Sequence, residues 1–574
     1  MINSDDLIKK PFYLNDDDIK WVNDTLNEMT IEDKIHHLFC LITYSDDEDY
    51  CKYIGSVIRP GGFMSRVMSM EECISSNKKM QKYSKIPMLV AANLEAGGNG
   101  IIKEGTILGR PLEIGATFDE LYARRLGEVC AKEGSAVGCN WAFAPIIDID
   151  YNFRNPITNT RTFGSNPEMV MKMGRAYVEE VEKNGMASCI KHFPGDGRDE
   201  HDQHIAISVN DLSTEKWDET YGMVYKKCID AGAKTVMVGH IMLPSYTKYF
   251  NPSINDNEIL PASVSYELVT KLLKEKLGFN GLVITDSTTM AGIATMLPRE
   301  KMVPMTIAAG CDMFLFTKNL EEDISFMEKG YKEGIITDER LNDAVIKILA
   351  LKASLKLHIK QKEGKLVPEL DFARGIVGND KYISWSKECA DKAITLVKEE
   401  KGVLPLSKEK YKRILFYSLE NKASGPSFVM DDNQNERFMK KLEEVGFEVT
   451  KFIPAKGFEG MMTPVKEMTD KYDLIIYAAS LQTKSNQTVV RIEWENPMGA
   501  NVPTFTHTIP TIFISFENPY HLIDVPHVKT FINCYCGFET VMDSLIEKLM
   551  GKQKFIGNNP VDPFCGKWEA KVNW

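Results

Sequence analysis

The stretch KHFPGDGRDEHDQH, residues 191–204, contains three of the ten histidines of the chain and four acidic residues. Imidazoles and carboxylates at this density could hold a metal ion, transfer protons, or form a solvated polar loop. They lie on both sides of a Pro-Gly-Asp-Gly turn at residues 194–197. The rest of the sequence has to decide between these three alternatives.

A metal site is the weaker interpretation of this stretch. His192, His201, Asp202 and His204 carry suitable donor atoms, but three of them come from one short segment, whereas metal-dependent barrel hydrolases take ligands from several strands. The first strand region, KIHHLFCLIT (34–43), has two adjacent histidines, which in a strand would point to opposite faces. We therefore predict no metal ion and no cofactor.

Proton transfer fits the pattern better. Asp202 and His204 are two residues apart, so their side chains can meet in a turn. A carboxylate on one ring nitrogen fixes the tautomer and leaves the other nitrogen to exchange a proton. Gly195 and Gly197 would let such a loop move over a substrate. We interpret His201 as part of the polar loop only.

A carboxylate that could work together with this acid–base pair lies in GLVITDSTTM (281–290), at the end of an apolar run. Asp286 ends that run and is a candidate nucleophile. The alternative is a helix N-cap, but Ser287 or Thr288 could provide the cap instead. One carboxylate and one acid–base group are the minimum set for retaining glycoside hydrolysis.

These residues need a scaffold that brings strand ends together. Continuous apolar runs alternate with helical segments such as 119–138, 166–185 and 213–232, as expected for parallel strands covered by helices. The apolar runs cover residues 87–93, 141–150, 186–193, 234–240, 281–286 and 312–317. A doubly wound sheet and an N-terminal (β/α)8 TIM-type barrel both fit. The polar residues Asn93, Asp148, Asp150, His192, His240 and Asp286 all lie at strand ends, which favours the barrel, where such ends share one rim.

A second domain is expected after the helix at 338–357. We predict a barrel domain over residues 1–357, a linker over 358–383, and a smaller α/β/α sandwich over 384–574. The expected strands of the sandwich are 413–420, 447–453, 472–480, 511–518 and 530–536.

Composition limits the possible partners. A formal charge of -12 and an isoelectric point near 5.5 argue against a nucleic-acid partner. No run of eighteen apolar residues predicts a membrane span, and the first residues show no secretory signal, so we expect a cytoplasmic protein. The twelve cysteines form no CxxC pair and are expected to be reduced, mostly buried thiols.

The residues from Lys191 to His204 also resemble the motif of the β-N-acetylglucosaminidase branch of glycoside hydrolase family three: KH[FI]PG, one variable residue, Gly, four residues, then Asp-x-His. Every spacing of that motif is kept here. The resemblance continues through the segments 140–150, 155–164, 238–246, 260–290, 308–316, 394–406 and 514–522, and so covers most of the chain.

The resemblance implies roles for particular residues. Asp286 falls on the nucleophile of a retaining mechanism, His204 on its acid/base, and Asp202 on the partner of that histidine. Lys191, His192 and Arg161 fall on positions that bind sugar hydroxyls, and we expect Asn93 and His240 to face the substrate as well. The β-glucosidase branch takes a glutamate acid from its second domain, so the second domain here is expected to take no part in the chemistry.

Three positions depart from the family pattern. Asn93 replaces the acid of the usual Asp-Gln-Glu-Gly-Gly segment, which keeps hydrogen bonding but loses charge. Asp196 stands where the branch often has histidine, and Ser287 where relatives often have aspartate. The first departure leaves the choice of sugar open.

The sequence therefore predicts a retaining exo-β-N-acetylglucosaminidase that acts on small β-linked sugars containing N-acetylglucosamine, derived from cell walls or chitin. Because a histidine acid would not repel an anionic acceptor, a phosphorylase of the same sugars is one alternative. A glycosidase of another hexose is a second. From a different class, a non-catalytic sugar-binding protein is an alternative that the joint presence of Asp286, Asp202 and His204 disfavours. A metal-dependent hydrolase is a distant third. The oligomeric state is not predicted.

Overall fold

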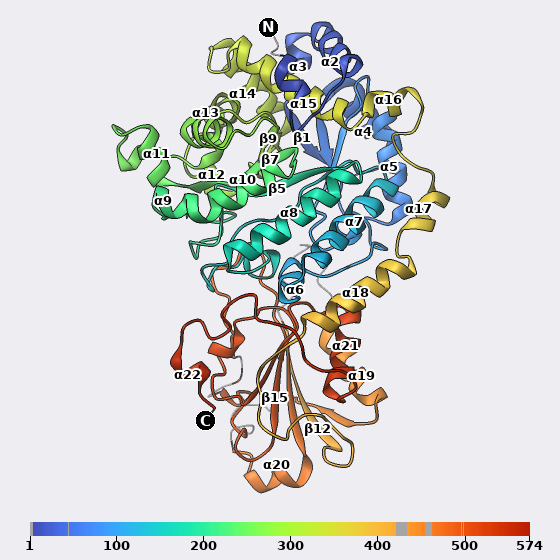
Figure 1. Cartoon of the computed structure of the whole chain (residues 1–574), viewed down its shortest axis with the longest axis vertical. Helices are drawn as coiled ribbons and strands as arrows, with labels where there is room; N and C mark the ends of the chain where they lie inside the picture. The colour runs from blue at the N-terminus through green and yellow to red at the C-terminus, as the bar shows by residue number, and fades with distance from the viewer. Residues whose placement is uncertain are drawn as a thin grey trace. The chain divides into compact units, whose positions relative to one another are not determined.

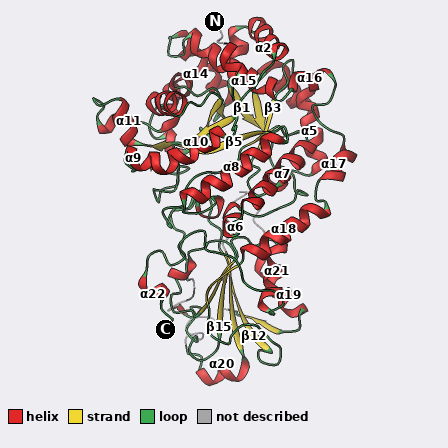
Figure 2. Cartoon of the chain, in the orientation of Figure 1, coloured by secondary structure: helices red, strands yellow, loops and turns green. Residues whose placement is uncertain are grey.

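The computed structural model describes residues 4–43, 45–420, 433–453, 462–494, 496 and 499–573. The chain forms two compact units (Figures 1 and 2). Unit 1 consists of Met1–Leu108, Glu120–Thr158 and Pro167–Ile383. Unit 2 consists of Gly109–Asp119, Asn159–Asn166 and Ser384–Trp574, and so takes two short segments from the N-terminal part of the sequence. The boundaries predicted from the sequence, 1–357 and 384–574, stay a prediction.

Unit 1 is an eight-stranded parallel barrel. Its strands are β1 (Phe39–Ile42), β2 (Gly62–Met64), β3 (Leu89–Ala92), β4 (Trp141–Ala142), β5 (Ala187–Phe193), β7 (Thr235–Val238), β9 (Leu282–Thr285) and β10 (Phe314–Leu315). They follow one another in the order β10-β1-β2-β3-β4-β5-β7-β9, and a parallel bridge between Ile284 and Met313 joins the two ends. The predicted TIM-type barrel is confirmed.

The strands are short where the sequence breaks the hydrogen-bond ladder. β4 covers two residues of the apolar run 141–150, because Pro145 has no N–H to donate to a neighbouring strand. Beyond it, the Ile147 N–H still donates to the Lys191 carbonyl at 2.9 Å, which keeps this stretch beside β5. Inside the barrel, Trp141 Nε1 donates to Thr235 Oγ1 at 2.8 Å, so the buried indole has a partner.

Helices surround the barrel, as Figure 2 shows. The longer ones of unit 1 are α2 (Asp16–Glu28), α5 (Met70–Lys82), α7 (Glu120–Ala136), α8 (Pro167–Lys183), α10 (Met223–Asp230), α13 (Arg299–Ala309), α14 (Leu320–Lys332) and α15 (Asp338–Ser354). The predicted linker contains α16 (Leu357–Lys362), α17 (Leu370–Ile376) and the start of α18 (Asp380–Ala393). The predicted place of His36 and His37 in the first strand region is wrong, because these residues end the helix α3 (Ile31–His37).

Unit 2 is a three-layer sandwich around a six-stranded sheet. The strands lie in the order β11 (Thr395–Lys398), β16 (Thr530–Asn533), β15 (Thr511–Ser515), β14 (Leu474–Ser480), β12 (Arg413–Glu420) and β13 (Glu448–Lys451). β11 pairs antiparallel with β16, and all other pairs are parallel. One face packs against α18, α19 (Gln434–Glu444) and α21 (Glu539–Leu549), and the other against α20 (Val465–Lys471) and α22 (Trp568–Lys571). The predicted sandwich is confirmed.

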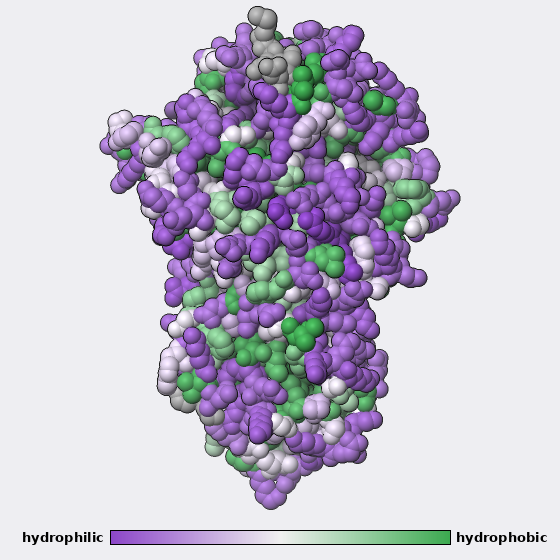
Figure 3. All heavy atoms as spheres, viewed as in Figure 1, coloured by the Kyte–Doolittle hydropathy of each residue, from purple (hydrophilic) through white to green (hydrophobic). Residues whose placement is uncertain are grey.

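The surface of the protein is mostly polar and its cysteines are unpaired. The face shown in Figure 3 is mainly hydrophilic, with apolar residues in scattered groups. All twelve cysteines are free thiols and eleven of them are buried, as predicted. Among the described residues, no helix is long and apolar enough to cross a membrane.

A buried ion pair holds the chain that follows β9. Arg299 Nε and Nη2 donate to the two carboxylate oxygens of Asp323, each at 2.6 Å, and the Asp323 side chain is fully buried. Arg299 Nη1 also donates to the Thr288 carbonyl at 2.9 Å. Thr288 lies two residues after Asp286, so this pair fixes the backbone next to the predicted nucleophile.

We expect Asp323→Ala to destabilise unit 1 by about 3 kcal/mol, because it leaves a partly buried guanidinium without its carboxylate. The measurement is the midpoint of denaturant unfolding of the full chain, followed by tryptophan fluorescence. Asp24→Ala is the control, since Asp24 forms an exposed ion pair with Lys20, and it should leave the midpoint unchanged. Equal midpoints for both variants would contradict this assignment.

Candidate active site

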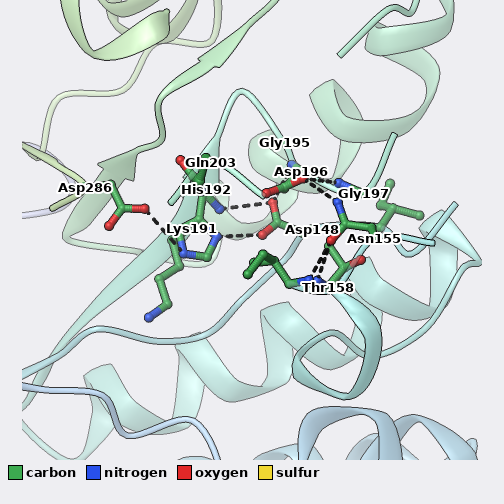
Figure 4. A network of polar contacts seen from close by, with 12 residues as sticks. Asp148, Asn155, Thr158, Lys191, His192, Gly195, Asp196, Gly197, Gln203 and Asp286 are labelled. Carbon is green, nitrogen blue, oxygen red and sulfur yellow. Dashed lines mark hydrogen bonds and ion pairs between the residues drawn. The ribbon is translucent and has the colours of Figure 1, made fainter. Parts of the chain in front are cut away.

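The predicted site residues of unit 1 meet at the carboxyl ends of the barrel strands. Asn93 follows β3, His192 lies in β5, His240 follows β7 and Asp286 follows β9. In a parallel barrel these ends form one rim, so residues distant in sequence become neighbours. Figure 4 shows His192 between Asp286 and Asp148, with Lys191 beside it.

Asp286 occupies a nearly buried position at this rim. Its side chain is 9% exposed, its backbone N–H donates to the Val238 carbonyl at 2.8 Å, and its Oδ1 accepts the Ser287 N–H at 2.7 Å. The next helix, α12 (Ala291–Ala294), starts five residues later with Met290 at its N-cap. Asp286 therefore does not cap a helix, and its second oxygen faces the rim.

The charge of Asp286 is stabilised by its neighbours. Burial alone would raise the pKa of this carboxyl, but three imidazoles and the Ser287 N–H outweigh it and hold the pKa below its usual value. The imidazoles are those of His192, His240 and His204. The carboxylate is therefore ionised at neutral pH, as a nucleophile must be.

His192 is held in one orientation by Asp148. Asp148 Oδ2 accepts the His192 Nδ1–H at 2.7 Å, and Asp148 Oδ1 accepts the His192 backbone N–H at 3.1 Å. This leaves His192 Nε2 directed at Asp286 Oδ2, 3.9 Å away (Figure 4). His192 thus links a buried carboxylate to the predicted nucleophile.

Asp202 and His204 form the predicted pair. His204 Nδ1 lies 2.6 Å from Asp202 Oδ1, which also accepts the His204 backbone N–H at 2.8 Å. The Asp202 side chain is fully buried, whereas the His204 ring is 28% exposed. Nε2 is therefore the ring nitrogen that remains for proton exchange.

The loop that carries this pair is held by hydrogen bonds from helix α12 and from His240, which follows β7. The Ala291 N–H donates to the His204 carbonyl at 3.1 Å, and the Gly292 N–H donates to the Gln203 carbonyl at 2.9 Å. Gln203 Oε1 accepts the His240 N–H at 2.8 Å. These contacts place the acid–base pair beside the segment that follows Asp286.

Lys191 forms a second group of donors and acceptors. Its Nζ lies 2.8 Å from Glu95 Oε1 and 3.3 Å from Asn93 Oδ1, and its side chain is 2% exposed. An ammonium with a carboxylate and an amide offers both donors and acceptors to vicinal hydroxyl groups. Asn93 and Lys191 thus lie together, as predicted.

His240 and Arg161 are the remaining two predicted site residues. His240 is buried, its Nδ1 lies 2.8 Å from Ser263 Oγ, and its Nε2 lies 2.9 Å from the Ser287 carbonyl. Both ring nitrogens therefore have partners within the protein next to Asp286. Arg161 ends the short helix η3 (Asn159–Arg161) of unit 2. The contacts of both residues with the substrate stay predictions.

Two other sequence interpretations can be compared with the structure. The His201 ring is exposed and pairs with Asp199, as expected for a polar loop residue. Among the residues that the structure describes, no group of three or more histidine, cysteine, aspartate or glutamate side chains is arranged to hold a metal ion.

Four residues of the site were not among the predicted site residues. Glu95 pairs with Lys191, Asp148 orients His192, Gln203 fastens the loop of His204, and the Asp196 N–H donates to Asp148 Oδ1 at 2.8 Å. The position of Asp148 at a strand end was a signal for its role. Nothing in the local sequence indicated the role of Gln203.

The comparison with known proteins identifies the family of this chain. Residues 30–351 match the family model of the glycosyl hydrolase family 3 N-terminal domain. A "Beta-N-acetylglucosaminidase/beta-glucosidase" of Cellulomonas fimi is 49% identical over 567 residues, which are 99% of this chain and 100% of that protein. A "Beta-hexosaminidase A" of Pseudoalteromonas piscicida is 30% identical over 60% of this chain and 58% of its own.

Solved structures give the same result. The "Beta-glucoside phosphorylase BglX" is 42% identical with a TM-score of 0.92, covering 99% of this chain and 100% of that chain. A family 3 β-N-acetylglucosaminidase from Paenibacillus sp. str. FPU-7 is 21% identical with a TM-score of 0.79, covering 93% and 99% of the two chains, and shares the fold. The chain therefore belongs to glycosyl hydrolase family 3 and is a glycosidase, an enzyme that cleaves glycosidic bonds.

Proposed function

We propose that this protein is a retaining exo-β-N-acetylglucosaminidase with Asp286 as nucleophile and His204, paired with Asp202, as acid/base. The observation that carries the proposal is the fastening of the His204 loop beside the ionised, nearly buried Asp286. A nucleophile and an acid/base on neighbouring rim segments are what double displacement at an anomeric carbon requires.

In the first step, a carboxylate oxygen of Asp286 bonds to the anomeric carbon while the bond from that carbon to the leaving oxygen breaks. The protonated His204 ring gives its Nε2 proton to the leaving oxygen, and Asp202 on Nδ1 stabilises the imidazolium before transfer. The proton and the electron pair thus leave with the aglycone, and a glycosyl-enzyme remains.

In the second step, the neutral His204 Nε2 takes a proton from water as the water oxygen bonds to the anomeric carbon. The bond to Asp286 breaks and its carboxylate is restored. Two inversions at one carbon retain the configuration. The neighbouring imidazole of His192 favours the returning negative charge, since it helps keep Asp286 ionised.

The proposed substrate is a small β-linked sugar with N-acetylglucosamine at its non-reducing end. Lys191, Glu95 and Asn93 would bind its hydroxyl groups, because they offer donors and acceptors at one point of the rim. The name of the Cellulomonas fimi protein supports this sugar, and its second half makes β-glucosides the second substrate to test. The name of the Pseudoalteromonas piscicida protein supports a hexosamine more generally. The predicted cytoplasmic location stays a prediction.

Phosphate as the acceptor in place of water is a second candidate function. It is supported by the 42% identity to a β-glucoside phosphorylase over nearly the whole chain. The electrostatics agree, because an acid/base histidine that has become neutral does not repel a phosphate anion as a carboxylate would.

We expect Asp286→Ala to lower kcat/KM for the p-nitrophenyl β-N-acetylglucosaminide by at least about 10³-fold, because no bond to the sugar can form. Asp211→Ala is the control, since Asp211 is an exposed aspartate paired with Arg198, and it should retain the wild-type rate. Added azide should rescue the Asp286 variant and give a glycosyl azide of inverted configuration. An Asp286 variant as fast as wild type would reject this nucleophile. The β-glucoside, measured in parallel, tests the sugar.

His204→Ala should lower kcat/KM for an alkyl β-glycoside by about 10²–10⁴-fold, because that leaving group needs a proton. A 2,4-dinitrophenyl glycoside, which departs without one, should lose far less. His201→Ala, the exposed histidine of the same loop, should change neither rate. If both substrates lost activity equally in the His204 variant, that residue would not be the acid.

Phosphate should change the product if the second candidate holds. We expect glycosyl 1-phosphate to appear by ³¹P NMR when substrate is turned over in phosphate buffer. The control is the same reaction in a buffer without phosphate at equal pH and ionic strength. Free sugar as the product at every phosphate concentration would exclude the phosphorylase and leave the hydrolase.

A further inference from the structure

Asp196 lies at the far end of a chain of contacts that leads to Asp286. Its backbone N–H donates to Asp148 Oδ1 at 2.8 Å, and Asp148 Oδ2 accepts the His192 Nδ1–H at 2.7 Å. His192 Nε2 in turn lies 3.9 Å from Asp286 Oδ2 (Figure 4). The Asp196 carboxyl group also interacts electrostatically with Asp148, so a change of its charge acts on the carboxylate that orients His192.

The carboxyl group of Asp196 is buried and only half of it is satisfied. Its Oδ1 accepts the Asn155 Nδ2–H at 2.9 Å and the Gly197 N–H at 2.6 Å. Its Oδ2 is buried and has no hydrogen-bond partner among the residues that the structure describes. A buried carboxylate oxygen without a donor is costly, so this geometry favours a proton on Oδ2.

The charges around Asp196 also favour its protonated, neutral form. Asp148 after β4 and Asp202 in the loop after β5 are the carboxylates that act on it, and the Tyr221 hydroxyl of helix η4 (Asp218–Gly222) donates to its backbone carbonyl at 2.6 Å. Burial first, and then Asp148, raise the pKa of Asp196 to about 7 against the bonds from Gly197 and Asn155, which lower it.

We infer that Asp196 is a positioning residue whose proton keeps a second negative charge away from Asp148 and so preserves the contact chain Asp148–His192–Asp286. This inference rests on the proposed function, in which Asp286 is the nucleophile. Once Asp196 loses its proton, two neighbouring buried carboxylates, Asp196 and Asp148, repel each other. Asp148 then no longer holds the His192 ring in its place against Asp286, and the rate falls.

The test measures kcat/KM against pH for a 2,4-dinitrophenyl β-glycoside. This leaving group needs no proton from His204, so loss of the His204 proton no longer affects the first step. For wild type we expect kcat/KM to fall above about pH 7, in line with the proton on Asp196. Asp196→Asn keeps the shape and stays neutral, so its rate at pH 8.5 should stay within about twofold of its rate at pH 6. Asp211→Asn, on the exposed surface, should keep the wild-type profile.

A second measurement does not depend on the variant folding. In wild type labelled with ¹³C at the aspartate carboxyl carbons, one resonance should titrate near pH 7. An alkaline fall that is unchanged in Asp196→Asn, or no aspartate resonance that titrates between pH 6 and 8, would overturn the inference. A wild-type protein that does not cleave the dinitrophenyl glycoside at any pH would instead reject the proposed function, so the two failures are distinguishable.

Discussion

An ionised carboxylate that is almost excluded from water is the constraint on which the rest of the site depends. Burial of a charge is costly unless nearby groups replace the lost solvation. At Asp286 this replacement comes from the Ser287 N–H and from surrounding imidazoles. The neighbours of Asp286 are therefore as much a part of the site as the carboxylate, and each of them must itself be held in place.

The other contacts at the rim hold these neighbours of Asp286 in place. His192 can face Asp286 because Asp148 takes its Nδ1–H, and His240 is fixed by Ser263 and the Ser287 carbonyl. Side chains held by such outer partners keep their geometry without a substrate. The buried Arg299–Asp323 pair, which bonds to Thr288, provides the same support from the backbone side.

The sequence predicted the architecture because the signals of a parallel barrel are local. Apolar runs that end in polar residues, separated by amphipathic segments, indicated both the strands and the rim. The short β4 follows from Pro145, and Thr30 with Asp33 forms the capping box that starts α3, so His36 and His37 could have been assigned to a helix. These two errors came from signals that were present and not used.

The residues that hold the site residues in place could not be predicted in the same way. The Lys191–Glu95 contact joins residues 96 positions apart, and the link from Gln203 to His240 depends on how a loop crosses to the next strand. Such contacts are set by tertiary packing and leave no spacing in the sequence. The end of an apolar run indicated Asp286 and the family motif indicated Asp202 and His204, but neither carried information about the buried groups that hold them.

The central claim is a covalent bond from Asp286 to the sugar, and trapping that bond is the most direct test. The protein would be treated with an activated 2-deoxy-2-fluoro-β-glycoside, digested, and analysed by mass spectrometry. We expect one added glycosyl group per chain, located on Asp286. A label on another carboxylate such as Glu95, or turnover of the natural glycoside with no trapped adduct and inverted product, would contradict it.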